Sequence, residues 1–157
     1  MLNIFGCPMH CGVGEKGLVH SLDYLNEHNP SLNLTTIPEI SVSDENSAHM
    51  KNFRSVLETC TSIAEYSYNN ILSKGNTPLF LGGDHSAAIG TVSATATQYD
   101  NIGLIWIDAH PDINTDLTSA SGNIHGMPIS ALLGNLSPAG ADLSKILTDN
   151  PKVKPDF

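Results

Sequence analysis

The chain has 157 residues, 40% of them hydrophobic, and a formal net charge of −9 with only 7 lysines and arginines. This length suits one ordinary core, and the hydrophobic content excludes a disordered tail. No apolar run approaches the roughly 20 residues that span a bilayer, which argues against a membrane protein, and the negative charge argues against a nucleic-acid partner, since two polyanions repel each other.

The first half of the chain predicts two strands and two helices. Residues 2–5 form a short apolar run that predicts a buried strand, and Gly6-Cys7-Pro8 then breaks it. Apolar residues at helical spacing predict a helix over residues 14–28, which Asn29-Pro30 stops. Residues 32–37 predict a second strand and residues 38–46 a surface loop. The three-and-four rhythm over residues 47–74 predicts a long amphipathic helix closed by Gly75.

The second half continues the alternation of strands and helices. Residues 77–81 and 102–107 predict strands, residues 86–97 a helix of small side chains, and residues 125–133 a short helix. Trp106 is expected in the core because it lies on the last of these strands. Such alternation predicts parallel pairing with right-handed crossovers. The pattern therefore predicts the α/β class, an open parallel sheet with helices between its strands, with residues 1–157 in a single domain.

Imidazole and carboxylate side chains follow two of the predicted strands. Asp108, His110 and Asp112 stand at alternate positions after the run 102–107, and His85 follows the run 77–81. An extended chain repeats its side-chain direction every second residue, so the first three side chains can converge on one point. Because parallel α/β sheets bind ligands at the carboxyl ends of their strands, we expect a metal site there.

Three motifs carry a family resemblance. They are Gly82-Gly83-Asp84-His85-Ser86, Asp108-Ala109-His110-Pro111-Asp112-Ile113-Asn114 and Ser121-Gly122-Asn123-Ile124-His125-Gly126. In order and spacing they resemble the first three signatures of the arginase and agmatinase family, the ureohydrolases. The resemblance runs from near Met1 to about Gly134 and corresponds to the front half of a typical member. It implies an arginase- or deacetylase-like fold, which is a three-layer parallel sheet flanked by helices. The chain would be the amino-terminal part of a ureohydrolase domain, truncated relative to a typical member.

The resemblance implies a centre of two Mn²⁺ ions at the carboxyl ends of the strands. By this resemblance His85 would bind the first ion together with Asp108 and Asp112. His110 would bind the second ion, and Asp108 would bridge both. Carboxylate and imidazole without thiolate also suit Mn²⁺ better than a structural zinc ion, which agrees with this assignment.

The resemblance also implies a substrate and a reaction. His125 matches the histidine of the family that shuttles a proton, here to the leaving amine. Asn114, Ser121 and Asn123 match positions that recognise the carboxylate and amino groups of an amino acid in arginases. L-Arginine is therefore the favoured substrate, hydrolysed to ornithine and urea by a hydroxide between the ions.

The sequence departs from the family pattern in one respect. Family members carry a further Asp-x-Asp pair after a later strand, and no Asp-x-Asp follows Asp112 here. Four protein ligands would then serve two ions that each prefer about six donors. We expect this chain to bind Mn²⁺ weakly, as one ion, and to be inactive or nearly so alone.

Other functions remain open from the sequence. An agmatinase, or another hydrolase of guanidino or formimino compounds, is the nearest alternative to an arginase. A non-catalytic metal-binding remnant would explain the missing carboxylate pair. A metal-dependent deacetylase is more distant, because it would require a different histidine-rich motif that this sequence lacks.

The cysteines and the amino terminus bear on cellular location. Cys7, Cys11 and Cys60 are odd in number and sparse, so they provide no disulfide framework. The start of the chain has no basic leader. We expect a cytoplasmic protein, whose full-length parent would, by the family resemblance, assemble as a homo-oligomer, either a trimer or a hexamer.

Overall fold

Strands and helices alternate along the chain in the computed structural model, which describes residues 1–43, 47, 49–149 and 152–154. The strands are β1 (Leu2–Cys7), β2 (Thr35–Thr36) and β3 (Thr77–Gly82). The α-helices are α1 (Ser21–His28), α2 (Phe53–Asn70), α3 (Ala87–Gln98), α4 (Pro128–Leu132) and α5 (Ala141–Ser144). Short 3-10 helices are η1 (Lys16–His20), η2 (Pro30–Leu32), η3 (Leu72–Lys74) and η4 (Ile124–Gly126). No helix among the described residues is long and apolar enough to cross a bilayer.

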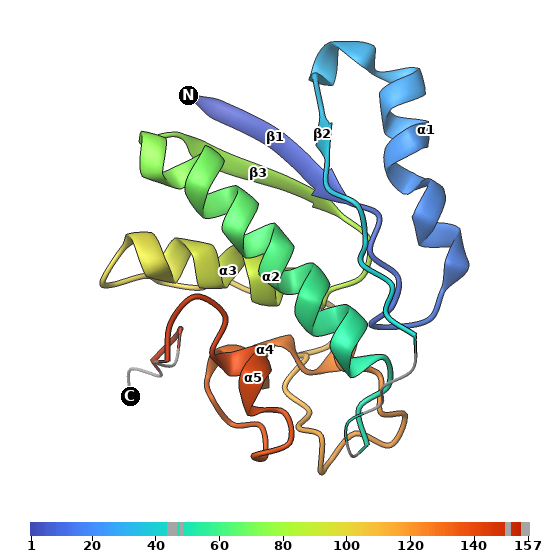
Figure 1. Cartoon of the computed structure of the whole chain (residues 1–157), viewed down its shortest axis with the longest axis vertical. Coiled ribbons are helices and arrows are strands. Elements are labelled where there is room, and N and C mark those ends of the chain that lie inside the picture. The colour runs from blue at the N-terminus through green and yellow to red at the C-terminus, as the bar shows by residue number, and fades with distance from the viewer. Residues whose placement is uncertain (44–46, 48, 150–151, 155–157) are drawn as a thin grey trace.

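The described strands form one parallel sheet with the order β2-β1-β3 (Figure 1). β1 lies in the centre and pairs with β3 along its whole length, from Leu2 opposite Thr77 to Cys7 opposite Gly82. β2 adds only two pairs, beginning with Phe5 opposite Thr35. The helical segments between successive strands return the chain to the same end of the sheet, as parallel pairing requires. The predicted parallel α/β fold is thus confirmed.

Helices cover both faces of this sheet. Phe5 and Cys7 of β1 are fully buried in the core that α2 and α3 close. Gly6, between them, faces the other side, where Leu22 of α1 would lie 3.0 Å from a Cβ at this position. Because successive side chains of a strand point to opposite faces of the sheet, β1 contacts the helices on both faces. The flanking helices are visible on either side of the sheet in Figure 1.

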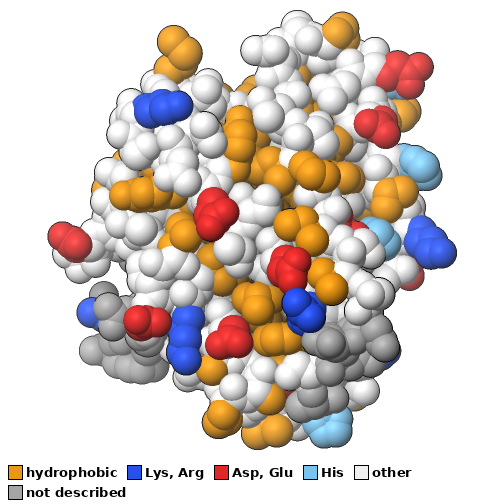
Figure 2. Space-filling view, in the orientation of Figure 1, with side chains coloured by type: hydrophobic (Ala, Val, Ile, Leu, Met, Phe, Trp, Pro, Cys, Tyr) orange, Lys and Arg blue, Asp and Glu red, His pale blue; other side chains and the backbone are white. Residues whose placement is uncertain are grey.

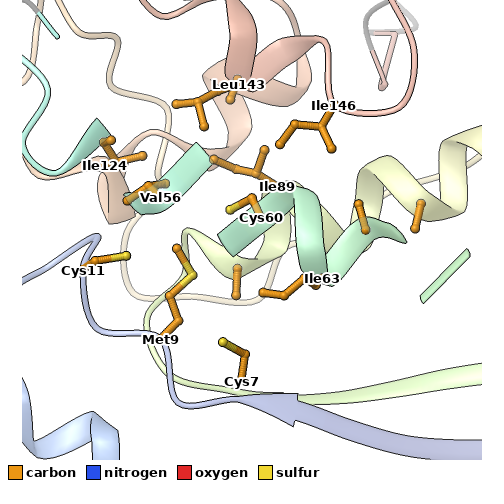
Figure 3. Close-up of a cluster of buried hydrophobic side chains, with 14 of the residues drawn as sticks. Cys7, Met9, Cys11, Val56, Cys60, Ile63, Ile89, Ile124, Leu143 and Ile146 are labelled. Atoms are coloured by element: carbon orange, nitrogen blue, oxygen red, sulfur yellow. The ribbon is translucent and has the colours of Figure 1, made fainter. Parts of the chain in front are cut away.

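The α2–α3 contact forms the centre of the hydrophobic core. Val56, Cys60 and Ile63 of α2 recur at three- and four-residue spacing and are all fully buried. A Cβ on Gly90 of α3 would lie only 2.4 Å from the Cys60 carbonyl oxygen, so glycine is needed where the helices approach. Figure 3 shows Cys60, Ile63 and Ile89 among the side chains of this cluster. The core extends from β1 to α5, where Leu143 is also fully buried.

The prediction of a strand over residues 102–107 was wrong. These residues belong to no strand of the structure and make no backbone hydrogen bond within the part of the chain described. Ile105 is 85% exposed and Ile107 is 94% exposed. Trp106 is half-buried instead of lying in the core. An apolar run indicates only a local tendency to form a strand. A strand also needs a neighbouring strand to satisfy its backbone hydrogen bonds.

Most other elements agree with the sequence, with shifted boundaries. The predicted strand over 32–37 is reduced to Thr35–Thr36, because η2 occupies its start. The long helix starts at Phe53 and not at residue 47, since Asn52 adopts a left-handed conformation with φ of 52°. Residues 38–43 form a loop as expected, and residues 44–46 lie outside the described part. His49, which falls within the predicted helix over residues 47–74, lies in a turn before α2.

A buried carboxylate anchors the segment that follows α4. Asp116 is 1% exposed and accepts hydrogen bonds from the Ser137 backbone N–H at 2.9 Å and from the Ser137 hydroxyl. Burial by itself raises the pKa of Asp116, but these hydrogen bonds outweigh burial and hold the pKa below its usual value. The ionised carboxylate therefore stabilises the fold.

Replacing Asp116 by asparagine is expected to lower the free energy of unfolding by about 2 kcal/mol near neutral pH. Because the native pKa is lowered, the stabilisation is present above the unfolded pKa of about 4 and is lost as the pH falls through the native pKa. The difference between wild type and Asp116→Asn should therefore shrink from pH 5 toward pH 2. Urea denaturation at several pH values measures this, with the exposed Asp142→Asn as control. A difference independent of pH would contradict the assigned role.

Candidate functional site

The turn after β3 places His85 at the carboxyl end of the sheet. The Gly83 N–H donates to the Cys7 carbonyl at 3.1 Å, and the Asp84 N–H donates to the Met9 carbonyl at 2.8 Å. A Cβ on Gly83 would lie 1.8 Å from the Met9 oxygen, so only glycine allows this approach. α3 begins at Ala87, immediately after the turn. The segment after β1 is thereby fastened to the loop that carries His85.

His85, Asp108 and Asp112 meet in one cluster. The His85 Nδ1 atom lies 2.7 Å from Asp108 Oδ2 and 3.0 Å from Asp112 Oδ2. One ligand atom from each residue lies within 4.8 Å of the other two, the only such group of three among the described residues. The side chains come from two loops that are 23 or more positions apart in sequence. The structure thus brings together three of the four metal ligands expected from sequence.

The chemistry of the cluster fits a divalent cation. Two carboxylate oxygens face the same His85 nitrogen, so this nitrogen either donates its hydrogen to them or binds a metal ion together with them. The pKa of Asp108 is below its usual value, first because the His110 N–H donates to Oδ1 at 3.0 Å and also because His85 is close. Donors around a six-coordinate ion with bonds of about 2.1 Å at right angles lie about 3 Å apart. The two spacings from His85 Nδ1, 2.7 Å to Asp108 and 3.0 Å to Asp112, are similar.

The backbone of the second loop explains how Asp112 reaches the cluster. Asp112 is 7% exposed and has φ of 46°, a conformation that aspartate and asparagine adopt more readily than most residues. Its carbonyl accepts a hydrogen bond from Ile129 of α4 at 3.1 Å. The left-handed turn, together with this bond, directs the carboxylate toward His85.

His110 lies beside the cluster and outside it. Its side chain is 82% exposed, and its Nδ1 atom lies 4.0 Å from Asp108 Oδ1. Next to it an open hollow of about 560 Å³ is lined mainly by apolar side chains, with Asp108 and His110 at its edge. Trp106, which lines this hollow, also packs edge-on against the His85 ring, with centroids 5.7 Å apart. The hollow is the space next to the cluster that a small ligand could enter.

The expected proton shuttle and substrate-binding residues lie on one loop system. The His125 N–H donates to the Gly12 carbonyl at 3.2 Å, and Asn114 N–H donates to the Gly126 carbonyl at 3.1 Å. Asn123 donates from Nδ2 to the Val13 carbonyl at 3.5 Å. Ser121 is exposed, and its hydroxyl accepts from the Asn123 N–H at 3.2 Å. Within the described residues none of these four side chains bonds directly to the cluster.

Two carboxylates near these residues were not singled out from sequence. Asp84 is 7% exposed, and Glu39 lies in the loop predicted only to be on the surface. Burial raises the pKa of Asp84, while hydrogen bonds from Ser86 and Gly12 and the charge of His125 oppose the rise. Asp84 could have been found from sequence, because it lies in the motif that contains His85. For Glu39 no local pattern distinguishes it from any acidic loop residue.

The three cysteine thiols are structural. Cys7, Cys11 and Cys60 are free and buried. Burial, together with the charges of Glu39 and Asp84, raises the pKa of the Cys7 thiol to about 12 and raises that of Cys11 further. In Figure 3 the Cys7 and Cys11 side chains point into the core. A thiol that stays protonated is a poor nucleophile and a poor metal ligand.

A parallel α/β sheet with a His and Asp cluster at its carboxyl edge is the layout of a ligand-binding α/β protein. Residues 2–147 match the sequence model of the arginase family. The arginase of Bacillus subtilis (strain 168) is 37% identical over 165 residues, which cover 99% of this chain and 54% of that protein. The arginase of Bacillus caldovelox is 35% identical, with 99% and 55% covered. This chain therefore belongs to the arginase family.

Solved structures agree with this assignment. The crystal structure of arginase from Bacillus subtilis subsp. subtilis str. 168 matches with a TM-score of 0.73 and 37% identity, over 98% of this chain and 53% of that one. The arginase of Entamoeba histolytica in complex with L-ornithine matches with a TM-score of 0.74 and 25% identity, over 92% and 52%. The chain spans about half the length of the relatives that it matches.

Proposed function

We propose that this chain carries part of the metal and substrate site of an arginase-type ureohydrolase. The observation that supports this most strongly is the convergence of His85, Asp108 and Asp112 in a member of the arginase family. These residues would hold one Mn²⁺ ion, and His110 with the bridging Asp108 would contribute to a second. The family membership supports a divalent metal, and the oxygen and nitrogen donors are compatible with Mn²⁺.

The proposed substrate is L-arginine, converted with one water to ornithine and urea. Divalent ions at the cluster would supply Lewis acidity and would lower the pKa of water near the guanidinium carbon. His125 would donate the proton that the departing amine needs when the C–N bond breaks. Asn114, Ser121 and Asn123 would hold the carboxylate and amino groups of the amino acid. The relatives that are arginases, and one structure with L-ornithine, support this choice over agmatine.

Calorimetric titration with Mn²⁺ and a urea-release assay test the proposal. The described cluster has three ligands, and the sequence lacks the later Asp-x-Asp pair, so we expect one ion per chain and little turnover of L-arginine. Absence of Mn²⁺ binding would reject the metal assignment. Two tightly bound ions with rapid turnover would reject the expectation of a weak, single site. Mn²⁺ binding with no detectable urea release, in place of the slow turnover expected, would favour the second candidate, a non-catalytic metal-binding protein, for the chain alone.

We further propose a single-domain, cytoplasmic protein. One buried cluster contains residues from Phe5 to Ile146, which supports one domain over residues 1–157. The free, buried cysteines are compatible with a reducing compartment. Acidic and basic side chains are interspersed on the face shown in Figure 2. Assembly of the full-length parent as a homo-oligomer, trimer or hexamer, is part of the same proposal, and sedimentation of that parent would test it.

A further inference from the structure

Two carboxylates, that of the part-buried Glu39 and that of the buried Asp84, hold the loop of residues 10–13 through consecutive backbone N–H groups. Glu39 Oε2 accepts from the His10 N–H and from the Cys11 N–H, the latter at 3.0 Å. Asp84 Oδ2 accepts from the Gly12 N–H at 2.9 Å. The Glu39 side chain is 11% exposed, and its Oε1 atom lies 2.9 Å from His10 Nδ1. Hydrogen bonds to an ionised acceptor at such a site are stronger than those between neutral groups.

The carbonyl side of the same loop holds two residues of the proposed site. The Gly12 oxygen accepts the His125 N–H, and the Val13 oxygen accepts the side-chain amide of Asn123. The loop therefore has carboxylates on one side and the proposed proton donor and substrate ligand on the other. The N–H groups of His10 and Cys11 lie 29 and 28 positions before Glu39 in the sequence. The placement of the loop therefore depends on tertiary contacts and not on local structure.

We propose that Glu39 is a positioning residue that places His125 and Asn123 by fixing the 10–13 loop. The inference rests on the proposed function for the chemical role of those two residues. Without the Glu39 carboxylate, two neighbouring N–H groups in a part-buried position lose their acceptor. The loop then keeps the bond from the Gly12 N–H to Asp84 and the bond from the Asn52 side-chain amide to the Cys11 carbonyl, at 2.9 Å. The hydrogen bond that the His125 N–H donates to the Gly12 carbonyl then loosens with the loop.

Glu39 tests this coupling more cleanly than Asp84 does. Asp84 directly precedes the proposed ligand His85, so a substitution there would disturb the metal cluster as well. Glu39 makes no hydrogen bond or ion pair with the cluster, His125 or Asn123 among the described residues, and reaches the latter two through the loop. An effect of Glu39 on His125 is therefore an effect transmitted by the loop.

Amide hydrogen exchange, followed by NMR on the metal-free chain, tests the proposal. In Glu39→Ala, we expect exchange at the His125 N–H to rise at least about tenfold and the Asn123 side-chain amide signals to shift. The α2 core amides, such as that of Ile63, should exchange as in wild type. Glu39→Gln keeps a neutral acceptor and should give a smaller rise, of at least about twofold. Glu65→Ala, which removes an exposed carboxylate, should change none of these rates.

The outcomes separate this proposal from a general loss of stability. A folded Glu39→Ala protein in which the His10 and Cys11 amides loosen while His125 and Asn123 are unchanged would overturn it. Equal acceleration at His125 and Ile63 would also overturn it, because that marks global unfolding. If Glu39→Ala does not fold, Glu39→Gln decides, and an unchanged His125 rate there is the negative result. Failure of wild type to bind Mn²⁺ would reject the proposed function and leave this exchange result intact.

Discussion

Replacing Asp112 by asparagine is expected to weaken Mn²⁺ binding by at least about tenfold. Loss of a hydrogen-bond partner behind a metal ligand already costs 10–100-fold in affinity, and loss of a charged ligand itself should cost no less. Asparagine has nearly the same shape and tolerates the left-handed backbone at this position, where φ is 46°. The change therefore removes charge from the cluster with little strain.

Isothermal titration calorimetry of wild type and variant measures this effect. Asp100→Asn is the matched control, since Asp100 is exposed and lies outside the cluster. His110→Asn should have a smaller effect on the first ion, because its imidazole is 82% exposed and outside the group of three. Equal affinity of wild type and Asp112→Asn would show that Mn²⁺ binds elsewhere or not at all.

Truncating Ile63 to alanine is expected to lower the free energy of unfolding by about 2–5 kcal/mol. Ile63 is fully buried between α2 and α3, and its side chain lies 3.1 Å from the position of a Cβ on Gly90. The helices approach so closely there that neither can move in to fill the space left behind. The loss therefore includes both the transfer of the removed carbons and the cavity that remains.

Urea denaturation of wild type and variant measures this loss. The slope of the free energy of unfolding against urea concentration should be the same in both, because it depends on the surface exposed on unfolding. Leu117→Ala serves as control: this leucine is 74% exposed, and its truncation should change stability by less than about 0.5 kcal/mol. A loss below about 1 kcal/mol for Ile63→Ala would mean that the α2–α3 contact contributes less than its burial indicates.

Local patterns in the sequence predicted the elements that carry their own signal. The three- and four-residue spacing of apolar residues in α2 and the short apolar run of β3 were sufficient, because helices and strands differ in the sequence spacing and length of their apolar segments. The cluster of His85, Asp108 and Asp112 followed from their place after apolar runs. For Asp108 and Asp112 the predicted convergence did not depend on a formed strand, since the left-handed turn at Asp112 brings its carboxylate to the same point.

The sequence by itself therefore determined the parallel α/β class, the family motifs and the residue types of the cluster of His85, Asp108 and Asp112. Tertiary structure alone decided that residues 102–107 form no strand, because strand pairing depends on a neighbour that an apolar run does not reveal. It also decided that Glu39 holds the 10–13 loop and that Asp116 holds Ser137. Those bonds join residues 21 or more positions apart, and a single polar residue in a loop carries no periodic pattern that could indicate its distant partner.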